Sequence, residues 1–193
     1  TSQIDHLVDH HFEQIGEPDH ICRPTLTKAL KMLSGSSACF LETGTANYGA
    51  QSTILFDSYV SNYGGLVHTV DIDPSPGLAV RNLCSPRTRF YCNDSISFLE
   101  LAPQVPIEPG QKLLVYLDSW DVSLHDSFPS ASHCLGELMA ILPLLIKHSG
   151  LLLIDDTPVD ASLFDLNPSD SSSLIGISQF MANYGVCPGK GAF

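Results

Sequence analysis

Three aspartates follow apolar runs in a pattern that suits a divalent cation. Asp155 and Asp156 come directly after the apolar run of residues 151–154, and Asp118 comes directly after the run of residues 112–117. Mg²⁺ prefers hard oxygen ligands, and carboxylates brought together repel one another unless a cation neutralises them. A bound dication would also polarise a substrate hydroxyl group. The pattern predicts a metal site at these three aspartates. In the alternative, Asp155 ends a strand, Asp156 caps a turn and Asp118 only lines a ligand pocket.

Polar residues after the earlier apolar runs suit a nucleoside that carries an amino acid. Glu42 follows the first run and precedes a loop with Gly44 and Gly49, and Asp71 follows the second run. The loop is not the GxGxxG that binds a dinucleotide pyrophosphate. A carboxylate at Glu42 suits a free amine, and Asp71 can accept hydrogen bonds from ribose hydroxyls. The alternative is a pair of turn glycines with Glu42 as a cap.

The elements that must position these residues alternate along the chain. Short apolar runs separated by helical stretches predict βαβ units, a mainly parallel sheet and a doubly wound, Rossmann-like α/β domain of three layers. Ligands bind such sheets at the carboxyl ends of the strands, so we expect the polar residues to share one rim. The expected strands are residues 37–41, 66–70, 88–92, 112–117 and 151–154, and the expected helices between them are residues 50–63, 77–84, 96–102 and 132–147.

The two ends of the chain carry further elements. Two helices, residues 3–15 and 25–33, predict a helical cap over residues 1–35, followed by the ligand-binding domain over residues 36–193. A polar loop, a helix at residues 174–184 and a strand, turn and strand follow the fifth run. A domain of this kind usually continues at that point, so we expect its C-terminal strands to be incomplete.

Five motifs in this order carry a family resemblance: "FLETGTANYGAQST", "VHTVDIDP", "NDS", "VYLDSWD" and "LLIDDT". Together they resemble the class I S-adenosylmethionine-dependent methyltransferases. Within that superfamily the chain is similar to the divalent-cation-dependent O-methyltransferases of the catechol type, and "DSW" with "DDT" also resembles the cephalosporin-hydroxylase-like branch. The match covers roughly residues 40–158.

The resemblance implies a role for each matching residue. Catechol-type enzymes have a lysine three residues after the first metal aspartate, where this chain has Asp121, so catechol-type substrates are not implied. An aspartate there could act as a base or an extra ligand. Apart from the resemblance, His125 lies in the loop after the apolar run of residues 112–117 and is a second candidate base, the alternative being an exposed loop histidine. The resemblance implies three sets of cofactor contacts. Asp71 would bind the ribose, and Asp94 and Ser95 would lie beside the adenine. The loop on the methionine side would contain Glu42, Gly44, Thr45, Gly49 and Ser52. The catalytic set is Asp118, Asp121 and His125, and the metal set is Asp118, Asp155 and Asp156.

Composition narrows the class of protein further. The 193 residues carry a formal net charge of −12, which argues against nucleic acid or an anionic membrane as partner. No apolar stretch approaches the roughly 18 residues of a membrane span. The six cysteines lack metal-finger spacing and predict a reducing, cytoplasmic compartment without a zinc site. His6 and His10, one helical turn apart, are interpreted as a solvated helix face.

The sequence therefore predicts an S-adenosylmethionine-dependent methyltransferase that acts on a hydroxyl group of a small molecule with the help of Mg²⁺. A homodimer is compatible with it. Two alternatives stay open: an NAD-type oxidoreductase on a related fold, against which the missing GxGxxG counts, and a methyltransferase-like binding domain without activity.

Overall fold

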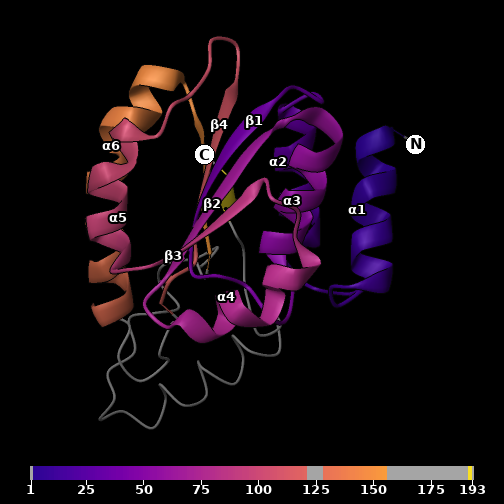
Figure 1. Cartoon of the computed structure of the whole chain (residues 1–193), viewed down its shortest axis with the longest axis horizontal. Helices are drawn as coiled ribbons and strands as arrows, with labels where there is room; N and C mark the ends of the chain where they lie inside the picture. Colours follow the sequence, from indigo (N-terminus) through magenta and orange to yellow (C-terminus); the bar gives the residue numbers. More distant parts are fainter. Residues whose placement is uncertain (1, 121–127, 156–190, 193) are drawn as a thin grey trace, which may run out of the picture.

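A six-stranded sheet in the order β3-β2-β1-β4-β5-β6 forms the centre of the molecule (Figure 1). The structure is a computed structural model that describes residues 2–120, 128–155 and 191–192. The first five strands are parallel and β6 runs antiparallel to β5. The strands are β1 (Ala38–Thr43), β2 (Gly65–Asp71), β3 (Thr88–Cys92), β4 (Lys112–Leu117), β5 (Leu151–Ile154) and β6 (Gly191–Ala192).

Helices cover both faces of this sheet, which makes the three layers that the sequence predicts (Figure 1). The helices α1, α2 and α3 pack on one face, and α5 and α6 pack on the other. Their bounds are α1 (Gln3–Gln14), α2 (Arg23–Met32), α3 (Ser52–Tyr63), α4 (Pro74–Val80), α5 (Ser95–Leu101) and α6 (Phe128–His148), with 3₁₀ turns at Arg81–Leu83 and Ala102–Gln104. The predicted doubly wound, Rossmann-like α/β fold is confirmed.

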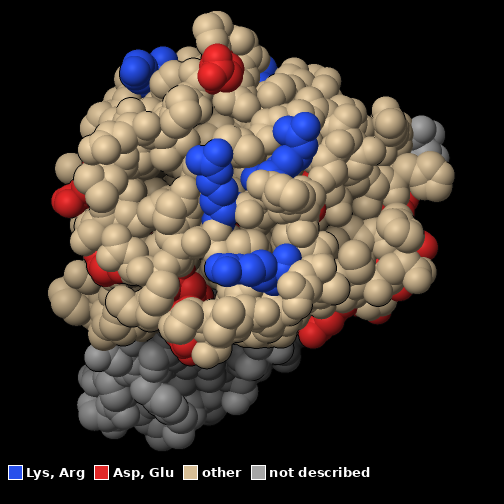
Figure 2. Space-filling view, viewed as in Figure 1, with Lys and Arg blue, Asp and Glu red and all other residues tan. Residues whose placement is uncertain are grey.

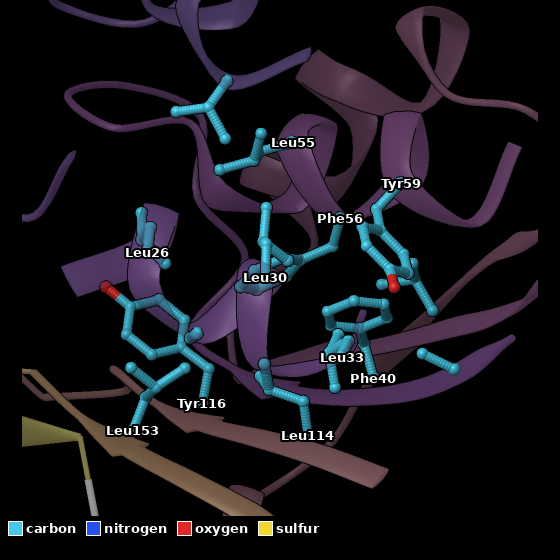
Figure 3. Close-up of a cluster of buried hydrophobic side chains, with 14 of the residues drawn as sticks. Leu26, Leu30, Leu33, Phe40, Leu55, Phe56, Tyr59, Leu114, Tyr116 and Leu153 are labelled. Carbon is cyan, nitrogen blue, oxygen red and sulfur yellow. The ribbon is translucent and has the colours of Figure 1, made fainter. Parts of the chain in front are cut away.

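Alternation along the strands assigns each side chain to one of two cores. In β4, Leu114 and Tyr116 face the α1–α3 layer, whereas Leu113, Val115 and Leu117 face the α5–α6 layer. Every residue of β1 is buried, as expected for a parallel strand that is covered on both faces. Figure 3 shows the first core, in which aromatic rings of β1, α3 and β4 pack with leucines of α2.

Local signals explain where helices begin. Ser2 and Asp5 form a capping box at the start of α1, with the Asp5 amide donating to Ser2 Oγ at 3.2 Å and the Ser2 amide donating to Asp5 Oδ2 at 2.9 Å. The predicted helix at residues 77–84 is wrong in its bounds. It begins at Pro74 because the Asp73 carboxylate caps it and proline fits the first turn, and beyond Val80 it continues only as a 3₁₀ turn.

The predicted helical cap at residues 1–35 shares a core with the sheet. Val8 and Phe12 of α1 and Leu30 of α2 are buried together with Phe40 of β1. The domain boundary near residue 35 stays a prediction. The predicted helix at residues 174–184 lies outside the described residues, and of the final strand–turn–strand pattern only β6 is described.

Two surface properties bear on partners. Helix α6 is long and apolar enough to cross a membrane by length and composition alone. Its residues Ile141 and Leu144 pack in the α5–α6 core, whereas only 28% of its most apolar 18-residue window is buried. Figure 2 shows one face of the molecule, on which Lys and Arg stand near the centre and most Asp and Glu lie toward the margins. The negative net charge is therefore not spread evenly over this face.

Candidate functional site

A cavity of about 370 Å³ opens at the carboxyl ends of β1, β2, β4 and β5. The strand order reverses between β1 and β4, so the cavity lies at the switch point where doubly wound sheets bind ligands. Seven of the predicted site residues line it, namely Gly44, Thr45, Gly49, Ser52, Asp71, Asp118 and Asp155. The residues that sequence reasoning placed at four strand ends are thus brought together here.

Gly44 allows the loop after β1 to touch the end of β4. Its φ is +80°, and a Cβ atom at this position would lie 1.9 Å from the carbonyl oxygen of Asp118. Any side chain would have to displace the Asp118 backbone, and the left-handed conformation would strain it as well. A glycine is therefore required at position 44 if the loop and the end of β4 are to line the same cavity.

The carboxylate of Asp71 is oriented by backbone amides on both sides. The Thr45 amide donates to Asp71 Oδ2 at 3.1 Å, and the Asp73 amide donates to Asp71 Oδ1 at 2.9 Å. The Thr45 hydroxyl in turn bonds with the Thr69 hydroxyl at 2.9 Å. Each oxygen of Asp71 keeps capacity to accept another hydrogen bond. Asp71 is thus a fixed acceptor at the wall of the cavity.

Glu42 is buried under the loop and does not reach the rim. It lies inside β1 with no exposed surface, because β1 extends two residues past the predicted strand end and α3 covers this face. The Ser52 hydroxyl donates to Glu42 Oε1 at 2.7 Å, and the Thr53 hydroxyl donates to Glu42 Oε2 at 2.6 Å. The expectation of a shared rim is therefore wrong for Glu42.

Burial with no cationic partner among the described residues changes the acidity of Glu42. The pKa of this carboxyl is raised from 4.5 to about 7, and desolvation by burial is the largest cause. The negative charge of Asp118 adds to the rise, and the hydroxyls of Thr53, Ser52 and Thr69 partly offset it. Thr53 Oγ1 also accepts the Ala46 amide at 3.0 Å. Glu42 thus fixes the start of α3 and, through Thr53, the cavity loop.

Tyr116 joins the two described aspartates of the predicted metal set. Its hydroxyl donates to Asp155 Oδ2 at 2.8 Å, and the same hydroxyl interacts with the carboxylate of Asp118. Burial and the nearby charge of Asp118 raise the pKa of Tyr116 well above its ordinary value, so the phenol stays a neutral donor. Within the described ranges no group of three or more His, Cys, Asp or Glu side chains is placed to hold a metal. Asp156 lies outside these ranges.

Backbone hydrogen bonds carry the sheet beyond the formal strand ends. The Gly44 amide donates to the Val70 carbonyl at 2.8 Å, the Asp118 amide to the Thr43 carbonyl at 3.0 Å, and the Asp155 amide to the Leu117 carbonyl at 2.9 Å. The residues at the base of the cavity, Gly44, Asp118 and Asp155, therefore belong to the hydrogen-bonded sheet although they line the opening.

The predicted adenine-side residues form local contacts. Asp94 caps α5 by accepting the Ser97 amide at 2.8 Å, and this bond holds the pKa of Asp94 below its usual range. Ser95, the first residue of α5, bonds through its hydroxyl to His133 Nε2 at 2.8 Å. Neither residue belongs to the cavity lining.

Some residues at the site were not predicted from the sequence, and some predicted residues lie outside the described ranges. Tyr116, Ser119 and His20 contact the aspartates or line the cavity without having been predicted. Tyr116 had a usable signal, because it stands two residues before Asp118 in a strand and hence on the same face. The predicted residues outside the described ranges are Asp121, His125 and Asp156.

Comparison with solved structures agrees with this fold. MycE methyltransferase from the mycinamycin biosynthetic pathway, in complex with Mg, SAH and mycinamycin VI, has a TM-score of 0.54 and 17% identity over 95% of this chain and 48% of that chain. This chain thus spans about half the length of MycE. The likeness shows that the two chains share a fold.

Two further structures have lower TM-scores. Cofactor-bound Rv0187 from MTB has a TM-score of 0.48 and 14% identity over 96% of this chain and 77% of that chain. Human methyltransferase-like protein 13 in complex with SAH has a TM-score of 0.45 and 20% identity over 89% of this chain and 72% of that chain. The sequence matches no protein-family model and no curated protein sequence.

Proposed function

We propose that this protein binds S-adenosylmethionine and transfers its methyl group to a hydroxyl oxygen of a small molecule, with Mg²⁺ held at Asp118, Asp155 and Asp156. One observation carries the proposal: at the switch point, a single cavity joins the amide-fixed carboxylate of Asp71 to the Gly44 loop and to two further aspartates. The likeness in fold to MycE, whose structure holds Mg and SAH, supports it.

The described residues fit the nucleoside part of this cofactor. Both oxygens of Asp71 can accept from ribose hydroxyls while they keep their bonds to the amides of Thr45 and Asp73. A volume of about 370 Å³ lies within the usual range of small-ligand sites. Ser52 lines the cavity and is held from below by Glu42. We therefore assign Glu42 to the cofactor site as a residue that acts through Ser52.

The two described aspartates fit a cation with oxygen ligands. Asp118 and Asp155 line one cavity, follow adjacent strands and contact the same Tyr116 hydroxyl. Their mutual repulsion is a cost that a dication would remove. Bound there, Mg²⁺ would lower the pKa of a coordinated substrate hydroxyl and so make its oxygen nucleophilic.

The chain's own contribution to methyl transfer is positioning. S-adenosylmethionine supplies an electrophilic methyl group on its sulfonium. The Gly44 loop and Asp71 hold the nucleoside side of the cavity, and Asp118 and Asp155 hold the side where the acceptor oxygen must lie. Orientation of two reactants in this way can supply most of the acceleration of such a displacement.

Calorimetric titration tests the proposal. We expect S-adenosylmethionine and its demethylated product, SAH, to bind, NAD not to bind, and Mg²⁺ to tighten binding of an acceptor hydroxyl compound. Asp156→Ala should abolish the Mg²⁺ response and leave SAH binding nearly intact, with the exposed Asp19→Ala as control. Absence of SAH binding would refute the cofactor assignment. An unchanged Mg²⁺ response in Asp156→Ala would refute the metal assignment alone.

A further inference from the structure

A second cavity, of about 370 Å³, lies between α5 and β3, the terminal strand of the described sheet (Figure 1). We call it the edge cavity; His68, Arg89 and Tyr91 line it on the sheet side. It shares no lining residue with the cavity at the switch point. Four aspartates line that first cavity, whereas the described lining of the edge cavity includes an arginine and no acidic residue. The two cavities therefore suit ligands of opposite charge.

The register of β2 and β3 brings the three polar side chains together. Arg89 pairs with His68 across the two strands, and Tyr91 lies two residues further along the same face of β3. His68 Nδ1 and the Tyr91 hydroxyl are hydrogen bonded at 2.9 Å, and the two rings are within 14° of parallel. The orientation of the His68 ring is thus fixed by β3.

One ring nitrogen of His68 is left over. The residue is 1% exposed, and its Nε2 has no hydrogen-bond partner among the described residues. Burial, with the nearby charge of Arg89, lowers the pKa of His68 from 6.5 to about 4, so the ring is neutral near pH 7. When Nδ1 accepts the proton of the Tyr91 hydroxyl, Nε2 carries the ring proton and is a donor. Because His68 lines the edge cavity, an oxygen acceptor bound there would satisfy it.

Arg89 adds a positive charge to this donor. Its side chain is exposed, and its guanidinium forms no ion pair or hydrogen bond with any residue that the structure describes. A guanidinium binds a carboxylate through two parallel N–H donors. One guanidinium and one neutral donor match a single negative charge, as on a carboxylate, better than the double charge of a phosphate.

The opposite wall of the edge cavity is apolar. Phe98 and Leu101 of α5 line it, together with Val105 after the 3₁₀ turn at Ala102–Gln104. Leu101 is 55% exposed, so an apolar ligand group would cover surface that now meets water. A cavity of about 370 Å³ is also within the usual range of small-ligand sites. The cavity thus combines a site for an anion with a site for an apolar group.

We propose that the edge cavity is a second binding site, which takes a small organic acid with its carboxylate at Arg89 and His68. The apolar part of the acid packs on Phe98, Leu101 and Val105. This site is separate from the cavity at the switch point, and the proposal does not depend on the proposed function.

Calorimetric titration with three probes tests the proposal. Benzoate has both required parts, benzamide is its neutral counterpart, and inorganic phosphate has charge without an apolar part. We expect benzoate to bind roughly tenfold more tightly than benzamide, because a charge-assisted hydrogen bond contributes about this much. Phosphate should bind more weakly than benzoate. Equal affinities for benzoate and either of the other two probes would overturn the proposal.

A matched pair of arginine variants locates the binding. Arg89→Gln should weaken benzoate binding by roughly tenfold. Arg87→Gln, the control, removes an exposed arginine on the same edge that lies outside the cavity lining and donates to the Gly65 carbonyl at 3.2 Å. It should leave the affinity for benzoate at the wild-type value. Equal benzoate affinities in the two variants would overturn the proposal.

The contribution of His68 has its own measurement. His68→Phe keeps an aromatic ring and removes Nε2, and it should weaken benzoate binding by roughly tenfold. If this variant does not fold, the ¹⁵N resonance of His68 Nε2 is followed in the wild-type protein instead. Saturation with benzoate should shift that resonance, whereas the same concentration of benzamide should shift it less. A resonance that stays unmoved by benzoate would overturn the proposal.

Discussion

The hydroxyl of Tyr116 lies 2.8 Å from Asp155 Oδ2 and donates a hydrogen bond to it. The ring of Tyr116 is buried in the α1–α3 core (Figure 3), and its hydroxyl contacts Asp155, which lines the cavity. A neutral donor that stays protonated can orient a carboxylate without competing for a cation. The position of Asp155 is therefore set from the core of the protein.

Tyr116→Phe should weaken Mg²⁺ binding by roughly tenfold, because loss of a group that orients a metal ligand typically has an effect of this size or larger. The measurement is Mg²⁺ titration in the presence of SAH. The matched control is Tyr59→Phe, which removes another buried hydroxyl, one that donates to the Ser36 carbonyl at 3.0 Å away from the cavity. Equal Mg²⁺ affinities in both variants would contradict a role of Tyr116 at the metal site.

Glu42→Gln should stabilise the protein above neutral pH. The folded-state pKa of about 7 lies above the ordinary 4.5, so the stabilising contribution of protonated Glu42 is full below pH 4.5 and is lost as pH rises through 7. A glutamine side chain does not titrate, so the variant does not lose stability in this way as pH rises. Its free energy of unfolding relative to wild type should therefore increase by about 3 kcal/mol between pH 4 and pH 8.

Urea unfolding of both proteins across this pH range measures that difference. The buried His68, whose pKa is lowered from 6.5 to about 4, contributes a slope of opposite sign, but it is present in both proteins and cancels. Glu13→Gln, an exposed change on α1, should leave the curve of wild type unaltered. Parallel curves for Glu42→Gln and wild type would show that Glu42 does not titrate in this range.

Gly44→Ala and Gly110→Ala form a matched pair. Both glycines have left-handed backbones, with φ of +80° and +84°, but a Cβ at Gly44 meets the Asp118 carbonyl whereas one at Gly110 meets nothing within 4 Å. Gly110→Ala should cost about 1 kcal/mol of stability, the usual penalty of this conformation. Gly44→Ala should lose considerably more and should also lose SAH binding. Similar unfolding midpoints would argue against the close approach of the two loops.

Asp71→Asn should weaken SAH binding by at least tenfold with a small effect on folding. The amide nitrogen of asparagine cannot accept from the Thr45 or Asp73 amide, so one of the two orienting bonds is lost together with one acceptor for ribose. Calorimetry measures the affinity, and Asp19→Asn is the exposed control. Wild-type affinity in Asp71→Asn would remove this residue from the cofactor site.

The sheet could be predicted because short apolar runs and glycine-bearing turns mark parallel strands directly. The strands at residues 88–92, 112–117 and 151–154 were predicted with their observed bounds. Strand β1 was predicted too short because its last two residues, Glu42 and Thr43, are polar, and an apolar pattern cannot indicate a carboxylate that α3 buries. This one error placed Glu42 on the rim.

The cavity could be predicted from the polar residues at the strand ends, since topology alone gathers Asp71, Asp118 and Asp155. The contacts that hold the cavity residues in place could not be predicted from the sequence. His133 and Glu137 stand one turn apart on an apolar helix, a pattern that equally describes a solvated face. In the folded chain Glu137 is buried and accepts a hydrogen bond from Ser119, a contact that the sequence pattern does not indicate. The positions of Asp121, His125 and Asp156 stay predictions.

The hydrogen bonds that extend the sheet past β1, β4 and β5 have a consequence for amide exchange with solvent. The amide hydrogens of Gly44, Asp118 and Asp155 belong to residues whose side chains or backbone border an open cavity, yet each is bonded to a neighbouring strand. Their exchange requires opening of the sheet itself, and such openings are among the rarest motions of a domain. The floor of the cavity should thus be as slow to exchange as the centre of the molecule.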